Sequence, residues 1–313
     1  MNTFWILMEQ IELFIVYLVI GMILVRTGVL SDKGLDWIAR VVMKLSLPTM
    51  IFVNVISQVD RVALVQSLSI IGLAVTASIL LFGLGVALTK LFHVEGDRSQ
   101  IYRAMTMFGN VGFMGIPIIE ELYGKGAIIY VVLYSFVYSI IFYSYGIYLF
   151  EKEKALQTGE KAKIKFEWKK MINPGIAASL IAMVIFLFQI KVPAPAVSFV
   201  DYLGNSCIPL SMILTGVSVA KLPLIEVFKD KKMYFFTFLK MLVIPIIAAV
   251  LIRNFHLDPV LSGIMVLMFG MPNGSMAVMM SIDYSLDSSI CSRGIVLTTL
   301  LSIITLPIVA YLI

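Results

Sequence analysis

The chain has 313 residues, of which 60% are hydrophobic and 14% are charged, and its net charge is +5. A soluble domain carries about 25% charged residues, so this composition excludes an ordinary soluble enzyme and indicates a polytopic membrane protein. The two cysteines, Cys207 and Cys291, lie in apolar segments without neighbouring histidines. This arrangement argues against a disulfide or a metal site, and we expect neither a metal nor another cofactor.

The predicted elements are all helices, because a helix of about 20 apolar residues crosses a bilayer. Glu9 and Glu12 stand where a cleaved signal peptide would need a basic segment, so we expect the first helix to remain in the mature protein. The sequence predicts ten transmembrane helices, at residues 4–25, 35–56, 64–90, 101–122, 126–150, 172–190, 199–220, 233–252, 258–282 and 290–312.

A charged stretch at residues 151–170 contains seven lysines and four glutamates. It divides the chain into a first repeat (1–150), a basic linker and a second repeat (171–313). Lysine and arginine concentrate in cytoplasmic loops. A cytoplasmic linker places 18 of these residues inside and 4 outside, which predicts a multi-pass plasma-membrane protein with both termini outside. The alternating charges indicate a solvated loop or surface helix, and they argue against nucleic-acid binding.

Two of the predicted helices are interrupted near their centres by glycine, asparagine and proline. The first interruption, Met107–Pro117, reads MFGNVGFMGIP, and the second, Met268–Ser275, reads MFGMPNGS. In lipid a freed backbone N–H or C=O finds no water, so such a break is tolerated where it lines a cavity or binds a solute. Corresponding breaks in two halves of a chain are typical of the substrate site of a secondary transporter.

The two halves are related by a nearly constant offset in the sequence. Met107 and Met268 are 161 positions apart, and so are Pro48 and Pro209. Each half has five predicted helices, an odd number, so the second half must insert with the opposite orientation. The sequence therefore predicts an inverted repeat, with the substrate site near the middle of the bilayer.

The first break, Asn110–Pro117, followed by Leu-Tyr-Gly at 122–124, resembles the fourth-helix motif of the auxin efflux carrier family. Met271–Ser275, followed by Leu-Thr-Thr-Leu at 297–300, resembles the corresponding region of the second half. The resemblance covers the whole chain and implies a carrier of organic anions, similar to bacterial malonate and malate permeases. It also implies a crossover fold like that of sodium/proton antiporters, in which broken helices 4 and 9 cross. Plant members have a proline where this chain has Gly109, so auxin itself is not implied.

The two breaks supply the expected substrate-binding residues. Their glycines and prolines release backbone N–H groups and half-helix ends that favour an anion. Their asparagines offer amide groups to a carboxylate, whereas the competing interpretation is a pair of glycine-mediated packing kinks. The expected binding residues are Gly109, Asn110, Gly112, Pro117, Pro272, Asn273, Gly274 and Ser275.

Polar and charged residues on other helices are secondary candidates. Glu120 and Asp283 could carry a coupling proton if their surroundings raise their pKa. Lys240 could offset the charge of the anion, although a helix-packing lysine and carboxylates in water are the competing interpretations. The candidates for lining the transport path are Ser46, Asn54, Tyr138, Ser206, Ser211 and Thr215.

The predicted function is a carrier that moves a small organic anion by alternating access. Proton symport, sodium symport and uniport are all compatible with the sequence, and relatives of this fold often form homodimers. An anion channel and a non-transporting sensor are the alternatives. An intramembrane protease is disfavoured, because the chain lacks the motifs of the aspartyl and zinc classes.

Overall fold

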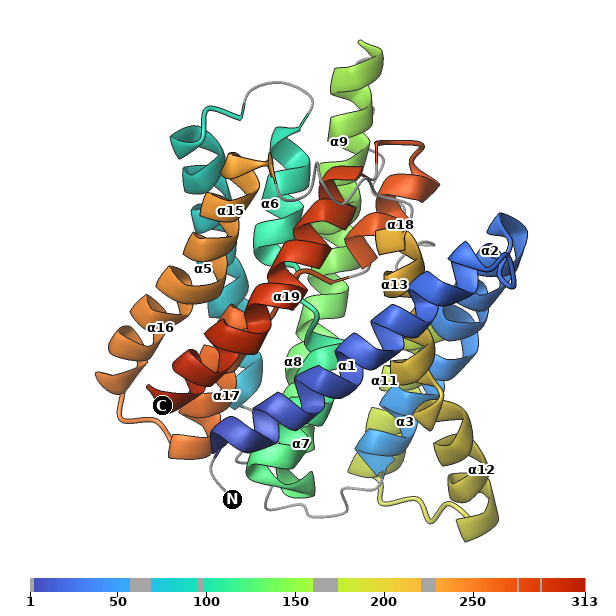
Figure 1. The fold of residues 1–313 in the computed structure, drawn as a ribbon. Helices are drawn as coiled ribbons and strands as arrows, with labels where there is room; N and C mark the ends of the chain where they lie inside the picture. Colours follow the sequence, from blue (N-terminus) through green and yellow to red (C-terminus); the bar gives the residue numbers. More distant parts are fainter. Residues whose placement is uncertain are drawn as a thin grey trace.

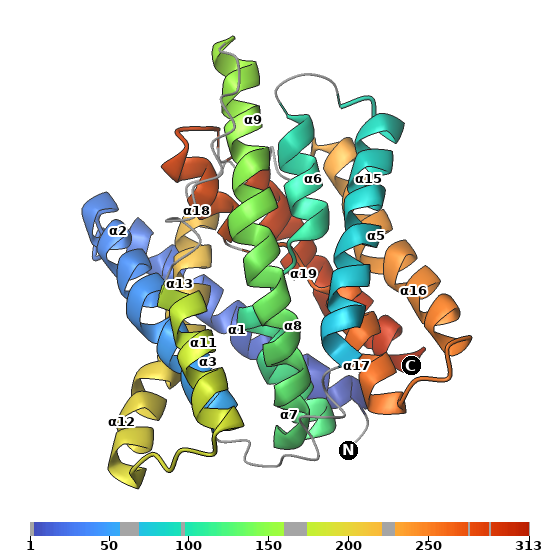
Figure 2. The same ribbon diagram turned by 180° about the vertical axis from the view of Figure 1, so that it is seen from behind.

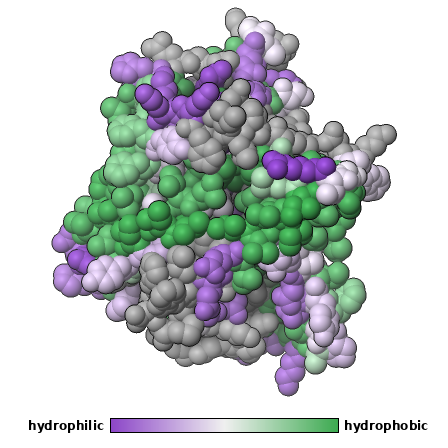
Figure 3. Space-filling view, viewed as in Figure 1, coloured by the Kyte–Doolittle hydropathy of each residue, from purple (hydrophilic) through white to green (hydrophobic). Residues whose placement is uncertain are grey.

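The computed structural model describes residues 3–56, 69–94, 98–159, 174–220, 229–274, 276–287 and 289–312. Every regular element in these ranges is helical, which confirms the all-α prediction, and one isolated bridge pairs Gly109 with Asn273. A hydrophobic band crosses the face shown in Figure 3, between hydrophilic patches above and below it. Five described helical stretches are long and apolar enough to span a membrane: Ser69–Leu91, Ile128–Thr158, Ala194–Leu214, Lys231–Arg253 and Ser289–Tyr311.

Of the remaining predicted spans, the first coincides with the 24-residue helix α1 and the others with shorter or interrupted helices. The ten-span inverted repeat therefore stays a prediction. The first half of the chain contains α1 (Thr3–Arg26), α2 (Asp32–Val41), η1 (Val42–Ser46), α3 (Leu47–Ile56), α5 (Ser69–Leu91), α6 (Ser99–Met107), η2 (Val111–Gly115), α7 (Ile116–Tyr123), η3 (Lys125–Ala127), α8 (Ile128–Ile141), η4 (Phe142–Gly146) and α9 (Ile147–Thr158). The second half contains α11 (Pro174–Leu187), α12 (Ala194–Asn205), α13 (Cys207–Ala220), α15 (Lys231–Phe238), η5 (Leu239–Val243), α16 (Ile244–Arg253), α17 (Pro259–Gly270), α18 (Met276–Asp283) and α19 (Ser289–Tyr311).

Three of these helices widen into a π-helical turn just before a proline. The turns η1, η2 and η5 end two residues before Pro48, Pro117 and Pro245 respectively. In each case the residue before the proline donates its N–H to the carbonyl five residues earlier. Proline has no N–H and its ring clashes with the carbonyl four residues back, so a wider turn relieves the clash without ending the helix.

The helices form two groups, each built from both halves of the sequence (Figures 1 and 2). In the first, which we call the α1 group, α1 packs along α13, and α3 packs on α11 and α12. The second, the α6 group, contains α5–α9 and α15–α19, with α5 on α6 and α8, and α16 and α19 on α17. The groups meet where α1 contacts α7 and α19 and where α3 contacts α8.

The α1 group is held by an unusually close helix pair. A Cβ atom at Gly216 of α13 would lie 1.9 Å from the carbonyl oxygen of Leu18, and one at Gly21 of α1 would lie 2.1 Å from that of Ile213. The two backbones therefore touch at positions that only glycine can occupy. Small residues at such crossings are the usual means of packing helices in a membrane, where lipid removes the hydrophobic drive between them.

The two described ends of the chain lie on the opposite side of the molecule from the end of α9, which contains the described start of the charged stretch. In Figure 1 the start of α1 and the end of α19 lie toward the bottom, whereas α9 ends at the top. The helix α9 continues to Thr158, and residues 160–173 lie outside the described ranges. The prediction of a solvated stretch from residue 151 is wrong for Glu153, which is buried. Its carboxylate accepts the N–H of Gln100 (3.2 Å) in the first turn of α6, where negative charge is favoured.

Candidate functional site

The two interruptions are hydrogen-bonded to each other. The N–H of Asn110 donates to the carbonyl of Pro272 (2.7 Å), and the N–H of Gly274 donates to the carbonyl of Phe108 (3.3 Å). The segments run antiparallel, with Gly109 opposite Asn273. Each break therefore supplies hydrogen-bond partners to backbone groups of the other break that have none within their own helix. An irregular segment at membrane depth requires such partners.

Gly109 allows the two breaks to approach closely. A Cβ atom there would lie 3.1 Å from the Cβ of Met271 and 3.3 Å from its carbonyl oxygen. The carbonyl of Gly109 itself accepts a hydrogen bond from the hydroxyl of Tyr138 (3.1 Å) on α8. The ring of Phe108 packs edge-on against Tyr138 and Phe142. The helix α8 thus fixes the first break from the side.

A cavity of about 60 Å³ lies beside the first break, at the boundary between the two helix groups. One side is formed by α3 of the α1 group, and the other by η2, α8 and the second break of the α6 group. A buried water needs about 10–15 Å³ of cavity volume, so this cavity holds only a few water-sized groups in this conformation. It is lined by Leu47, Met50, Ile51, Gly109, Asn110, Val111, Gly112, Ile116, Ser135, Tyr138, Ser139, Gly274 and Met276.

Hydrogen-bond donors converge on this cavity without partners of their own. The side-chain amide of Asn110, on a residue only 7% exposed, makes no hydrogen bond to any described residue. The buried hydroxyl of Ser135 likewise has no partner there. Val111 and Gly112 begin a helical segment, whose first N–H groups lack partners within the helix and carry partial positive charge. Such a set of donors suits an anion.

The second asparagine faces away from the cavity. Asn273 is fully buried, and its side-chain oxygen accepts a hydrogen bond from the ammonium of Lys240, which also donates to the carbonyl of Met105. The backbone N–H of Asn273 donates to the hydroxyl of Thr298 on α19 (3.0 Å). The two asparagines, which the sequence predicts in one role, therefore lie in different surroundings. Asn110 lines the cavity and Asn273 binds a buried cation behind it.

Of the other predicted binding residues, Gly109, Gly112 and Gly274 line the cavity, and Pro272 contributes the carbonyl that pairs with Asn110. Pro117 is the second residue of α7. The described structure does not include Ser275 or the side chains of Pro117, Asn54, Thr215 and Asp283.

Among the secondary candidates whose side chains the structure describes, only Tyr138 lines the cavity. Ser46 and Ser206 hydrogen-bond to each other (2.8 Å) within the α1 group, and Ser211 donates to the carbonyl of Ile208 (2.8 Å). Ser46 and Ser206 thus join η1 to α12, Ser211 bonds within α13, and none of the three lines the cavity. Glu120 is half-buried on α7 and does not line the cavity either.

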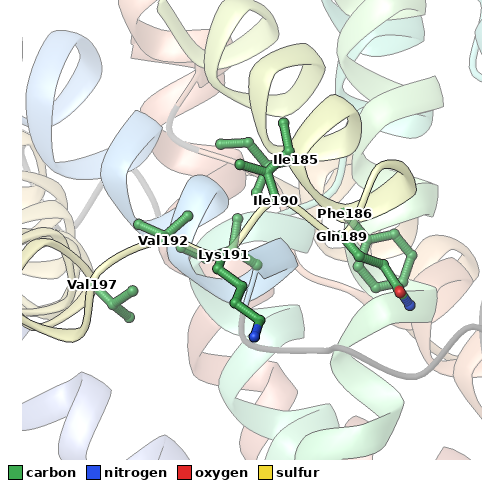
Figure 4. Close-up of a pocket in the computed structure, with 8 residues that line it drawn as sticks. Ile185, Phe186, Gln189, Ile190, Lys191, Val192 and Val197 are labelled. Atoms are coloured by element: carbon green, nitrogen blue, oxygen red, sulfur yellow. The ribbon is translucent and has the colours of Figure 1, made fainter.

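A larger cavity of about 320 Å³ lies where α11 ends and α12 begins (Figure 4). The described part of its wall is mostly aliphatic, and Gln189 and Lys191 are the two polar side chains there. Neither interrupted helix contributes to it. We therefore take the smaller cavity, where donors converge, as the candidate site.

Three groups that surround Asn273 are not among the predicted site residues: the Met105 carbonyl, Gly294 and Thr298. A Cβ atom at Gly294 would lie 2.8 Å from the side-chain nitrogen of Asn273, so this glycine makes room for the amide. In the sequence, Thr298 is marked only by its place in the Leu-Thr-Thr-Leu motif at 297–300. The partner of a backbone carbonyl such as that of Met105 cannot be predicted from residue type. Their roles depend on α6 and α19 meeting in three dimensions.

Replacing Thr298 by valine is expected to lower the thermal stability of the purified protein. The variant keeps the side-chain shape and leaves the buried N–H of Asn273 without an acceptor, at a cost of about 1–3 kcal/mol. The measurement is the melting midpoint in detergent, with Thr298→Ser as the matched control because serine keeps the hydroxyl. Equal midpoints for the valine and serine variants would show that this hydrogen bond does not stabilise the second break.

Comparisons with known proteins agree with these features. A family model described as a membrane transport protein matches residues 6–310. An uncharacterized transporter of Methanothermobacter thermautotrophicus is 22% identical over 304 residues, which cover 96% of each chain. An uncharacterized transporter of Methanocaldococcus jannaschii is 19% identical over 307 residues, which cover 96% of this chain and 97% of the relative. The chain therefore belongs to this membrane transport protein family, the auxin efflux carrier family that its two breaks resemble.

Proposed function

We propose that this membrane transporter is a secondary carrier of small organic anions, with its substrate site in the cavity beside Asn110. The single observation that carries this proposal is the cavity between the two helix groups, lined by a hydrogen-bonded pair of helix breaks. Interrupted helices that meet near the membrane centre are the usual substrate site of such carriers. The unpartnered donors of Asn110, Ser135 and the start of η2 favour a carboxylate.

Alternating access would follow from the position of this cavity. Its lining comes from α3 of the α1 group and from the breaks and α8 of the α6 group. Movement of one group against the other would expose the lining residues first to one side of the membrane and then to the other. The close pair of α1 and α13 suits the α1 group to be the fixed scaffold, and the α6 group then moves with the substrate.

The proposed topology is ten spans in two inverted repeats, with the broken helices α6–α7 and α17–α18 as helices 4 and 9 of a crossover. Two observations support it: both halves contribute to each helix group, and the chain ends lie opposite the end of α9 (Figure 1). With the basic linker in the cytoplasm, both termini would lie outside the plasma membrane. Coupling to a proton, to sodium or to neither, and association into a homodimer, are open within this proposal.

The test is stabilisation of the purified protein by a panel of carboxylates: acetate, malonate, malate and indole-3-acetate. Binding to the native state raises the melting midpoint by mass action. We expect a small dicarboxylate or monocarboxylate to raise it, and malonamide, the uncharged analogue of malonate, to leave it unchanged. If no carboxylate raises the midpoint of a well-folded sample, the organic-anion proposal is wrong.

A transport assay separates a carrier from its alternatives. Proteoliposomes loaded with the stabilising carboxylate should take up the labelled compound faster than empty ones, because a carrier exchanges substrate across the membrane. A channel would show no such acceleration, and a sensor would bind the carboxylate and move none. Either of these results would replace the carrier with the corresponding alternative.

A further inference from the structure

A lysine without a carboxylate partner among the described residues lies behind the two breaks. Lys240 of η5 is 2% exposed, and no described carboxylate lies within salt-bridge distance of its ammonium. A charge buried in this way is costly unless its hydrogen bonds and surroundings compensate for it. Ionisable residues at membrane depth are accordingly rare and are candidates for function by default.

The two contacts of this ammonium join the two interrupted helices. One N–H donates to the carbonyl of Met105, in the last turn of α6, and another to the side-chain oxygen of Asn273, in the second break. The last carbonyls of a helix lack partners within it and carry partial negative charge, so a cation is favoured there. The cation thus interacts with one half-helix end and with the opposite break at once.

Backbone carbonyl and side-chain amide oxygens, the two kinds present here, are also ligands for hard metal cations. In transporters with interrupted helices, unwound carbonyls and half-helix C-terminal ends coordinate the coupling sodium ion or proton. Here the corresponding oxygens are already bound by a side chain. We infer that Lys240 is a built-in cation that takes the place of a coupling sodium ion, so that the transporter operates without sodium.

The position of Lys240 also suits a carrier of anions. Its partner Asn273 is followed directly by Gly274, which lines the cavity, and Asn110 is hydrogen-bonded to the neighbouring Pro272. The charge therefore lies immediately behind the wall that carries the predicted substrate amide. This inference rests on the anion carrier proposed above, and it selects sodium-independent transport from the coupling modes that remain open there.

The experiment compares the melting midpoints of the full chain in sodium chloride and in choline chloride at equal ionic strength. The three proteins are the wild type, Lys240→Ala and Lys44→Ala; Lys44 lies in the π-helical turn η1 and is exposed. We expect equal midpoints in the two salts for the wild type and for Lys44→Ala. For Lys240→Ala we expect a higher midpoint in sodium, because the vacated oxygens can bind the ion and binding stabilises the native state.

Two outcomes would overturn the inference. A wild type that is specifically stabilised by sodium has a sodium site of its own, and this result decides the matter even if Lys240→Ala does not fold. A folded Lys240→Ala protein with equal midpoints in both salts would show that the lysine does not occupy a cation site. Neither measurement uses a carboxylate, so failure of the anion proposal in the panel above is distinguished from failure of this one.

Discussion

Replacing Gly216 by alanine is expected to prevent stable folding or to lower the melting midpoint by many degrees. The added Cβ would lie 1.9 Å from the carbonyl oxygen of Leu18, a backbone atom of α1 that no rotamer change can move. Overpacking a close-packed interface costs about 1–3 kcal/mol, and occasionally more, when only side chains must adjust. Here the two helices would have to separate along their whole contact, so the larger end of that range applies.

The matched control is Gly83→Ala on α5. Gly83 is also a helix glycine, but no heavy atom lies within 4 Å of its added Cβ, and the residue is exposed. Since alanine is a better helix former than glycine by about 1 kcal/mol, this variant should be as stable as the wild type or more so. The readouts are the yield of monodisperse protein and the melting midpoint. Similar values for Gly216→Ala and Gly83→Ala would contradict the close α1–α13 contact and weaken the α1 group as a rigid scaffold.

The helical class and the two breaks could be predicted because both follow from what lipid permits. Long apolar stretches must be helical there, and glycine, proline and asparagine in their middle must find partners within the protein. The glycines and prolines of Met107–Pro117 and Met268–Ser275 therefore mark the positions of the breaks by residue type alone. Their offset of 161 residues also indicates that they correspond. The hydrogen bonds from Asn110 to Pro272 and from Gly274 to Phe108 are the three-dimensional counterpart of that signal.

The direction of each side chain could not be predicted in the same way. Asn110 and Asn273 are the same residue type in corresponding breaks, yet one lines the cavity and the other binds Lys240. The difference arises from partners on other helices, Lys240 on η5 and Thr298 on α19. Similarly, the apolar stretch around Lys240 does not reveal which of its faces meets lipid.

Replacing Asn110 by alanine is expected to reduce carboxylate transport about 10- to 100-fold while leaving folding intact. The amide of Asn110 makes no hydrogen bond to any described residue, so its removal leaves none of the described groups newly unpaired. A hydrogen bond to a charged group contributes about 1.5–3 kcal/mol, and each 1.4 kcal/mol is a factor of ten in affinity. The measurement is initial uptake of the carboxylate found in the panel, at concentrations below half-saturation, together with the melting midpoint.

Two further variants test whether reduced transport in Asn110→Ala reflects a lost contact with an anionic substrate. Asn205→Ala, at an exposed asparagine that donates to Asp201 (3.2 Å), should transport like the wild type. Asn110→Asp keeps the side-chain size but adds a negative charge to the cavity, so an anion should be excluded even more strongly than by alanine. If the cargo is a cation, Asn110→Asp should instead bind it more tightly. Wild-type transport in Asn110→Ala would place the substrate elsewhere, because no other side-chain amide lines this cavity among the described residues.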